Sequence, residues 1–236
     1  MAKSRLSNAI VADYLRRIGS REIEPGTPLP PEAALCAQYG VGRSVVREAL
    51  QALDAKGFII VKQGSVAVVA PRHRWHVLDR DFLDATNPAE YFPLLQEARE
   101  VLEPALANLA AERISDDALA EMIALNHQLA EQHDDPERHA DLDIAFHDAV
   151  ARATDNVILV SLHSSITGLG QRTRIAAAAV PGAIDRAVFW HERIIDALRS
   201  GDGIGAGAAM HLHLTQVREE LRATQTQSTD EEEGAS

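Results

Sequence analysis

Three histidines and one aspartate have the side-chain types and the spacing that a metal site needs. Asp143 and His147 are four residues apart, so on a helix both side chains project from the same face. His191 and His213 lie on two later segments with helical periodicity. If these helices pack into a bundle, the four side chains could converge in its core and bind a divalent cation. Imidazole ligands suit zinc, nickel, cobalt or manganese.

The other histidines have weaker positions. His139 lies in the charged run Glu137-Arg138-His139, which predicts a solvated side chain, and His211 is two residues from His213 and faces elsewhere on a helix. An Asp-x-x-x-His pair is common, and a buried histidine that only completes a core is the alternative explanation. From the residues alone, both explanations stay open.

Arginines are the candidate contacts for an anion, because a guanidinium pairs with a carboxylate through two parallel bonds. Arg99 is the most unusual, since it lies between Leu95 and Leu102 in an otherwise apolar helical segment. Arg172 and Arg174 are further candidates, for which a surface position or a helix-pairing role is the alternative.

Near the N-terminus, a second short helix is predicted after a tight glycine-containing turn. It has an apolar stripe formed by Val46, Ala49, Leu50 and Leu53. Arg43 and Arg47 share the opposite edge, with Ser44 beside them. This arrangement suits a helix that lies in the major groove of DNA, and a plain solvated helix is the alternative.

A hairpin is predicted directly after these helices. Two β-branched runs, 58–61 and 66–69, flank a polar tip that contains Gln63 and Gly64. Three helices followed by a small hairpin predict a winged helix-turn-helix. In such a fold the tip is positioned to contact phosphates or a minor groove, whereas a plain surface hairpin is the alternative.

The charge distribution separates two parts of the chain. Through Trp75 there are 11 Lys and Arg against 6 Asp and Glu, whereas the rest has 12 against 29. A basic module followed by an acidic body predicts a nucleic-acid-binding surface at the N-terminus. The single cysteine, the absence of an apolar leader and the absence of a membrane-spanning run predict a cytoplasmic protein without membrane association.

The periodicity predicts a mainly α fold with two domains. We expect a winged helix-turn-helix over residues 1–71, a linker with a short connecting helix over 72–89, and an all-helical effector, metal-binding and dimerisation domain over 90–223. A disordered acidic tail is predicted over 224–236. The helices of the second domain are predicted at 90–113, 116–133, 136–153, 156–177, 184–200 and 203–223.

The chain resembles a known family. The order from Ile18 to Ile59, with PGTPLPPEAAL and YGVGRSVVREAL, is similar to the DNA-binding domain of GntR-superfamily transcription regulators. The helical body resembles the FCD effector domain of the FadR subfamily, through EAR with EPA at 97–105, DIAFH at 143–147, HERII at 191–195 and MHLHL at 210–214. The segment 70–79 resembles regulators of sugar-acid operons, such as those that answer galactonate.

The resemblance implies roles for the candidate residues. A metal ion held by Asp143, His147, His191 and His213 would bind and orient a small carboxylate effector, a sugar acid or hydroxy acid, without catalysing a reaction. Zinc is the expected cation, with nickel or manganese as alternatives. The resemblance places Arg99 at the effector carboxylate, and Arg172 is expected beside it.

Three positions depart from the family pattern. Gly42 replaces the usual Ser or Thr before the recognition helix, Val66 replaces a second wing glycine, and Ala33 stands where the fatty-acid regulator has an arginine that touches DNA. Family DNA contacts therefore do not transfer as a whole.

Together these observations predict a ligand-responsive, homodimeric transcription regulator, a repressor, and not an enzyme. Arg43, Ser44, Arg47, Gln63 and Gly64 are the expected DNA contacts, and a dimer would read a palindromic operator. One alternative is a metal-responsive regulator in which the cation is the signal. A metal-dependent enzyme fused to a DNA-binding head is disfavoured, because no separate general base accompanies the metal set by spacing.

Overall fold

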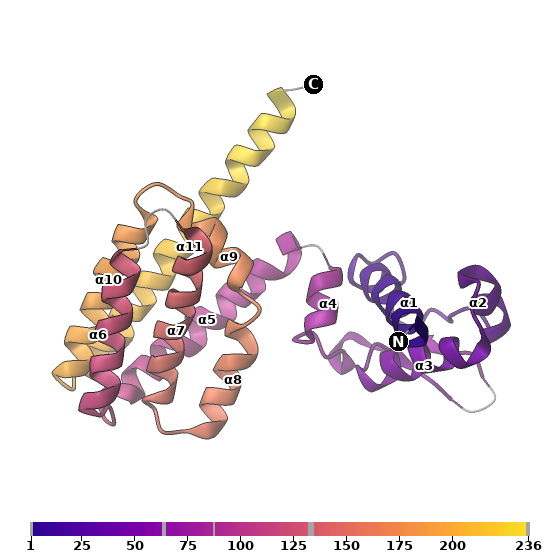
Figure 1. Ribbon diagram of the computed structural model, residues 1–236, viewed down its shortest axis with the longest axis horizontal. Helices are drawn as coiled ribbons and strands as arrows, with labels where there is room; N and C mark the ends of the chain where they lie inside the picture. The colour runs from indigo at the N-terminus through magenta and orange to yellow at the C-terminus, as the bar shows by residue number, and fades with distance from the viewer. Residues whose placement is uncertain (1, 63–64, 87, 132–134, 235–236) are drawn as a thin grey trace. The chain divides into compact units, whose positions relative to one another are not determined.

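A computed structural model describes the chain except residues 1, 63–64, 87, 132–134 and 235–236 (Figure 1). The chain divides into two compact units, residues 1–91 and 92–236, and each is described by itself. The first unit contains three helices, a two-stranded hairpin and two short helical segments. The second contains the helices of an all-α bundle, as the sequence predicts.

The N-terminal unit has the order expected for a winged helix-turn-helix. Its three helices are α1 (Ala2–Gly19), α2 (Glu32–Tyr39) and α3 (Arg43–Ala55). The strands β1 (Ile59–Ile60) and β2 (Val68–Val69) pair antiparallel, with Ile59 opposite Val69. The predicted hairpin is confirmed, although its paired part is shorter than the β-branched runs. The predicted apolar stripe of α3 is buried, with Val45 added to it.

The segment predicted as a linker with a short connecting helix belongs to this unit. It contains the short helix η1 (Arg72–Arg74) and α4 (Arg80–Ala85). Phe82 of α4 is fully buried, and its ring centroid lies 4.6 Å from that of Phe58, which also contacts Trp75 at 5.6 Å. α4 lies where the sequence predicts a short connecting helix. Three aromatic side chains hold the connection against the wing, a long-range contact that no local pattern reveals.

In the part of the chain that the structure describes, the bundle has seven helices. They are α5 (Pro88–Ala111), α6 (Asp116–Ala130), α7 (Pro136–Arg152), α8 (Val157–Thr167), α9 (Gln171–Ala178), α10 (Ala183–Arg199) and α11 (Gly203–Gly234). Ser115, Asp135 and Asn156 cap α6, α7 and α8, because their side chains accept hydrogen bonds from backbone N–H groups of the first turns.

Two predicted boundaries of the bundle differ from the structure. The single helix expected at 156–177 is two helices, α8 and α9, because Gly168 and Gly170 interrupt the ladder between them. α11 continues to Gly234, where the sequence predicts a disordered tail. No proline or glycine interrupts residues 208–233, and Ala, Gln and Glu there favour a helix.

The bundle core places the candidate metal residues together. Phe146 of α7, Ile194 of α10 and Leu214 of α11 are fully buried and belong to one apolar cluster. Because α7, α10 and α11 pack through these apolar side chains, the candidate metal ligands next to them in the sequence are also buried. Within the described residues, none of the helices combines the length and the apolar character needed to cross a bilayer.

Candidate metal centre

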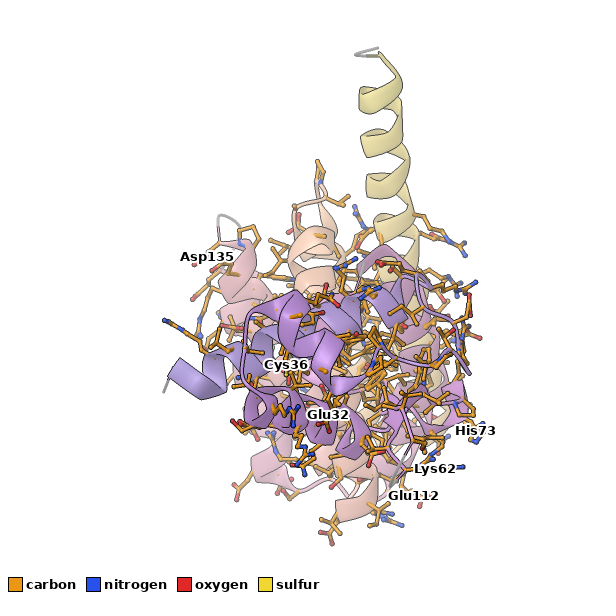
Figure 2. All side chains as sticks on the ribbon, turned by 90° about the vertical axis from the view of Figure 1, so that its right-hand side faces the viewer. Glu32, Cys36, Lys62, His73, Glu112 and Asp135 are labelled. Atoms are coloured by element: carbon orange, nitrogen blue, oxygen red, sulfur yellow. The ribbon has the colours of Figure 1, made fainter. Side chains whose placement is uncertain are left out.

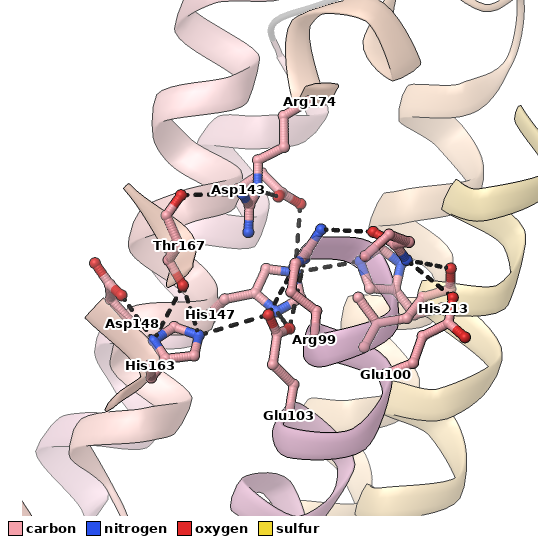
Figure 3. A network of polar contacts seen from close by, with 12 residues as sticks. Arg99, Glu100, Glu103, Asp143, His147, Asp148, His163, Thr167, Arg174 and His213 are labelled. Carbon is pink, nitrogen blue, oxygen red and sulfur yellow. Dashed lines mark hydrogen bonds and ion pairs between the residues drawn. The ribbon is translucent and has the colours of Figure 1, made fainter. Parts of the chain in front are cut away.

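Asp143, His147, His191 and His213 converge in the core of the bundle. They come from α7, α10 and α11, all four are buried, and one ligand atom from each lies within 4.8 Å of the others. Nε2 of His147 lies 3.2 Å from Nε2 of His213 (Figure 3). Oδ1 of Asp143 lies 3.6 Å from Nε2 of His147 and 3.5 Å from Nε2 of His191. The set predicted from the sequence is therefore assembled in space.

These distances fit a divalent cation. Two donor atoms, each about 2.1 Å from a metal ion, are about 3.0 Å apart at a right angle and about 3.4 Å apart at a tetrahedral angle. Within the described residues, neither ring nitrogen of His191 has a hydrogen-bond partner. A buried polar atom without a partner destabilises the folded state. A cation between the imidazoles would give these ring nitrogens a partner and so stabilise the bundle.

Glu103 of α5 orients one of the imidazoles. Its Oε2 lies 2.7 Å from Nδ1 of His147, so Nε2 of that ring is turned toward the other candidate ligands. Carboxylates commonly hold the outer nitrogen of a metal-binding histidine in this way. Sequence reasoning missed Glu103, although its place four residues after Arg99 on one helix face is a signal for it.

Two buried arginines stand beside the centre. Nε of Arg99 donates to Oε1 of Glu103 at 2.7 Å, and its NH1 donates to Gln96. Nε of Arg174 donates to Oδ2 of Asp143 at 2.6 Å, so Asp143 directs one oxygen to a guanidinium and the other to the imidazoles. NH2 of Arg174 is buried and has no hydrogen-bond partner among the described residues.

Among the described side chains of α9, Arg174 reaches the centre. The side chain of Arg172, the residue proposed from the sequence, lies outside the described residues. The sequence offers both arginines as candidates within the helix predicted at 156–177. In the structure the segment that contains them is the separate helix α9, which starts at Gln171 after Gly170.

Burial and neighbouring charges set the protonation of the centre. Burial lowers the pKa of His213 to about 3 and lowers the pKa of His191 well below its usual range, so both rings are neutral at neutral pH. Burial would raise the pKa of Asp143, but His147 and Arg174 outweigh it and hold that pKa well below its usual range. Neutral imidazoles and an ionised carboxylate are the forms that bind metals.

The formal charges of the centre leave room for an anion. Arg99 and Arg174 balance Glu103 and Asp143, and all four side chains are buried. A bound divalent cation would therefore add two uncompensated positive charges in a region shielded from water. Such a site favours a carboxylate ligand, with guanidinium groups in place to receive it.

A small cavity lies beside the centre. It has a volume of about 20 Å³ and is lined by residues of α5, α7, α9, α10 and α11, among them Arg99, Asp143, Arg174 and His213. His139 also lines it and is 5% exposed, so the prediction of a solvated His139 is wrong. His139 lies four residues before Asp143, and this spacing places it on the inward face of α7 despite its charged neighbours.

The predicted DNA-contacting residues of α3 lie on its outer face. Arg43, Ser44 and Arg47 are exposed, whereas the apolar stripe faces the core. Nε of Arg47 donates to both carboxylate oxygens of Glu32, which Figure 2 labels on α2. Gln63 and Gly64 at the hairpin tip lie outside the described residues.

Comparisons with known proteins agree with this architecture. The gntR family of bacterial regulatory proteins matches residues 6–69, and the FCD domain matches residues 95–216. The galactonate operon transcriptional repressor of Escherichia coli K12 is 32% identical over 225 residues, which is 92% of this chain and 95% of that protein. The chain belongs to the GntR family.

Other relatives of this GntR-family regulator support the same assignment. The regulator LutR of Bacillus subtilis 168 is 32% identical over 209 residues, 86% of this chain and 95% of LutR. A solved GntR structure from Streptococcus agalactiae, 29% identical, superposes with a TM-score of 0.51 over 90% of this chain and 99% of that one. The resemblance to FadR-subfamily regulators is confirmed, and the chain is a ligand-responsive transcription regulator.

Replacing one candidate ligand should remove metal binding. His213→Gln eliminates an imidazole donor, and we expect zinc affinity to fall roughly 100-fold or more, since even outer-shell partners of a metal contribute 10- to 100-fold. Zinc should raise the unfolding temperature of the wild-type protein and leave that of the variant nearly unchanged. His211→Gln, on an exposed position of the same helix, is the matched control. Equal zinc affinity in both variants would show that the centre is assigned incorrectly.

Proposed function

We propose that this regulator binds a small carboxylate, a sugar acid or hydroxy acid, at a divalent metal ion and so changes its affinity for operator DNA. Asp143, His147, His191 and His213 would hold the ion. The observation that carries the proposal is the buried convergence of these four side chains with two arginines. The E. coli relative is named for a galactonate operon, which agrees with a sugar acid.

Zinc is the expected cation. Three imidazoles and one carboxylate are ligands that zinc accepts, and nickel or manganese are the alternatives for the same set. The ion would supply a positive charge that attracts the effector carboxylate. Arg174 would orient Asp143, Glu103 would orient His147, and NH2 of Arg174 would remain available to the effector.

The exposed edge of α3 is the proposed reading surface. Arg43, Ser44 and Arg47 would contact bases and phosphates, and an arginine paired with a guanine contributes about 1–3 kcal/mol of discrimination. The ion pair with Glu32 restrains the side chain of Arg47, so its guanidinium is held at the exposed edge of α3. The hairpin tip with Gln63 and Gly64 would meet the backbone beside it.

A second copy of the chain is the proposed partner of α8. This helix has an unusual orientation, because its two buried residues are polar, His163 and Thr167. Val157, Ile158 and Leu162 point outward and are 75%, 66% and 51% exposed. An apolar face of this kind marks a protein interface. Pairing of two copies through α8 would place two reading helices on one palindromic operator.

Effector binding would require the bundle to move. The cavity of about 20 Å³ has room for about one water molecule, so an acid would enter only if a lining helix shifted. α9 is the shortest of these helices, and its neighbours Gly170 and Gly182 permit backbone changes. A ligand that binds only the shifted arrangement increases the population of that arrangement. Because α8 directly precedes α9 in the chain, a shift of α9 would also affect α8.

The same small cavity favours one alternative function. A divalent cation fits between the four ligands without any movement of the bundle, so the cation itself could be the signal. In that case the metal alone would change operator affinity, and acids would have no effect.

Operator binding measured with and without metal and acid tests the proposal. A labelled duplex selected by the protein from a random library serves as the operator, and fluorescence anisotropy reports binding. We expect galactonate with zinc to change the affinity by about tenfold, within the usual range of coupling between sites, and galactonate alone to have little effect. A change produced fully by zinc alone would favour the metal-responsive alternative, and no change under any condition would contradict the proposal.

Arg47→Ala is the control for the DNA side of this experiment. The variant should lose operator binding, because it lacks a reading-face guanidinium, yet it should bind zinc as the wild-type protein does. Specific binding retained by Arg47→Ala would show that the reading face is assigned incorrectly.

A charge placed on α8 should separate the two copies. Ile158→Glu is harmless in a single chain, because the side chain is exposed there, but buries an unpaired carboxylate in a paired one. We expect the wild-type protein to sediment as a dimer and the variant to sediment mainly as a monomer at micromolar concentration. Ile204→Glu, at an 82% exposed position on α11, is the matched control and should stay dimeric. An Ile158→Glu protein that dimerises like the wild type would exclude α8 as the interface.

A further inference from the structure

The side chain of Arg47 is held by one carboxylate. Its Nε donates to both oxygens of Glu32, at 3.1 and 3.0 Å, and this contact joins α3 to the first residue of α2. The terminal nitrogens NH1 and NH2 of Arg47 have no hydrogen-bond partner among the described residues. A guanine pairs with an arginine through two donors, which meet its O6 and N7 atoms. The contact with Glu32 therefore leaves available the two donors at the end of the guanidinium that such a base contact needs.

Glu32 is itself fixed to the rest of its unit. The backbone N–H of Val69 in β2 donates to the carbonyl of Thr27 at 2.9 Å, so the segment before α2 is paired with the wing strand. Pro30 and Pro31 follow, and their rings restrict the backbone directly before Glu32. The first turn of a helix also favours an ionised carboxylate, because the N-terminal end of the helix is positive. The acceptor for Arg47 is therefore in place before any DNA arrives.

Arg43 gives a contrast on the same helix. It is the first residue of α3, it is exposed, and its side chain has no partner among the described residues. A long side chain without a partner samples many rotamers, and ordering it on binding opposes association. Arg47 has already lost part of this freedom in the free protein. The two arginines are thus unequal, and Arg47 is the one that is oriented in advance.

We propose that Glu32 is a positioning residue for base recognition, which holds Arg47 toward one base pair in each half of the operator and away from the phosphates. Glu32 acts through Arg47 and does not need to contact a base itself. This inference rests on the proposed function, because the exposed edge of α3 must lie in a DNA groove for Glu32 to have this role.

The charge of Glu32 has a further consequence for binding. The pair is partly exposed in the free protein, with 66% of the Arg47 side chain and 37% of the Glu32 side chain accessible. An exposed ion pair contributes little to folding. Near DNA, the carboxylate repels phosphates and offsets part of the positive charge that attracts any duplex. Glu32 therefore weakens sequence-independent binding while it strengthens the preference for one base.

Selection of duplexes from a random library by the full chain, followed by sequencing, measures the base preference at every operator position. Arg47→Ala identifies the position that Arg47 reads, because the preference is lost there. Glu32→Gln keeps the size of the side chain and removes its charge. We expect Glu32→Gln to reduce the preference at that same position by about fivefold, the upper end for an exposed ion pair, and to leave the other positions unchanged. Its binding to an unrelated duplex should become stronger by about twofold.

Two further variants separate positioning from other effects. Glu24→Gln removes the same charge from an exposed position in the loop before α2 and should keep the base preference of the wild type. Arg47→Lys keeps the positive charge but lacks the planar fork, so adding Glu32→Gln to it should cause no further loss of preference. Glu32→Gln should also unfold at nearly the wild-type temperature, because the pair that it breaks is exposed.

The outcomes distinguish the inference from the proposed function. An unchanged preference at the Arg47 position in Glu32→Gln, an equal loss at all positions, or weaker binding to the unrelated duplex overturns the inference while the proposed reading surface stands. A preference that Arg47→Ala leaves intact at every position shows that the reading surface is assigned incorrectly, and the inference then fails with it.

Discussion

The packing of the bundle interior depends on how the buried carboxylate of Asp143 is paired. It is buried, and its two oxygens serve different partners, the guanidinium of Arg174 and the imidazoles of His147 and His191. A buried charge is tolerated only when it is paired and hydrogen-bonded. This requirement draws α9 and α10 onto α7. It also explains why Arg174 is almost fully buried, because its Nε donates to Oδ2 of Asp143.

The same requirement connects the centre to the rest of the regulator. α9, which supplies Arg174, is short and flanked by glycines, and α8 before it exposes an apolar face. His163 on α8 is buried, and its Nε2 lies 3.6 Å from Glu103, which in turn contacts His147. One contiguous polar network therefore runs from the candidate metal ligands to the helix proposed to join two copies. If two copies pair through α8 as proposed, this network would connect the candidate metal centre to their interface.

Local patterns were sufficient for some features and insufficient for others. The apolar stripe of α3 and the four-residue spacing of Asp143 and His147 are properties of single helices, and sequence periodicity predicted both. The packing of Phe82 against Phe58 and the hydrogen bond from Arg174 to Asp143 depend on contacts between distant elements. The charged neighbours of His139 predict a solvated side chain, whereas its spacing from Asp143 places it on the inward face of α7.

The central claim is that metal and acid meet at one buried centre, and thermodynamic linkage tests it most directly. Calorimetry gives the affinity for galactonate with and without zinc, and the affinity for zinc with and without saturating galactonate. If both ligands share the centre, zinc strengthens acid binding and the acid strengthens zinc binding by the same factor. Acid affinity that is identical in zinc-free and zinc-loaded protein would contradict the account.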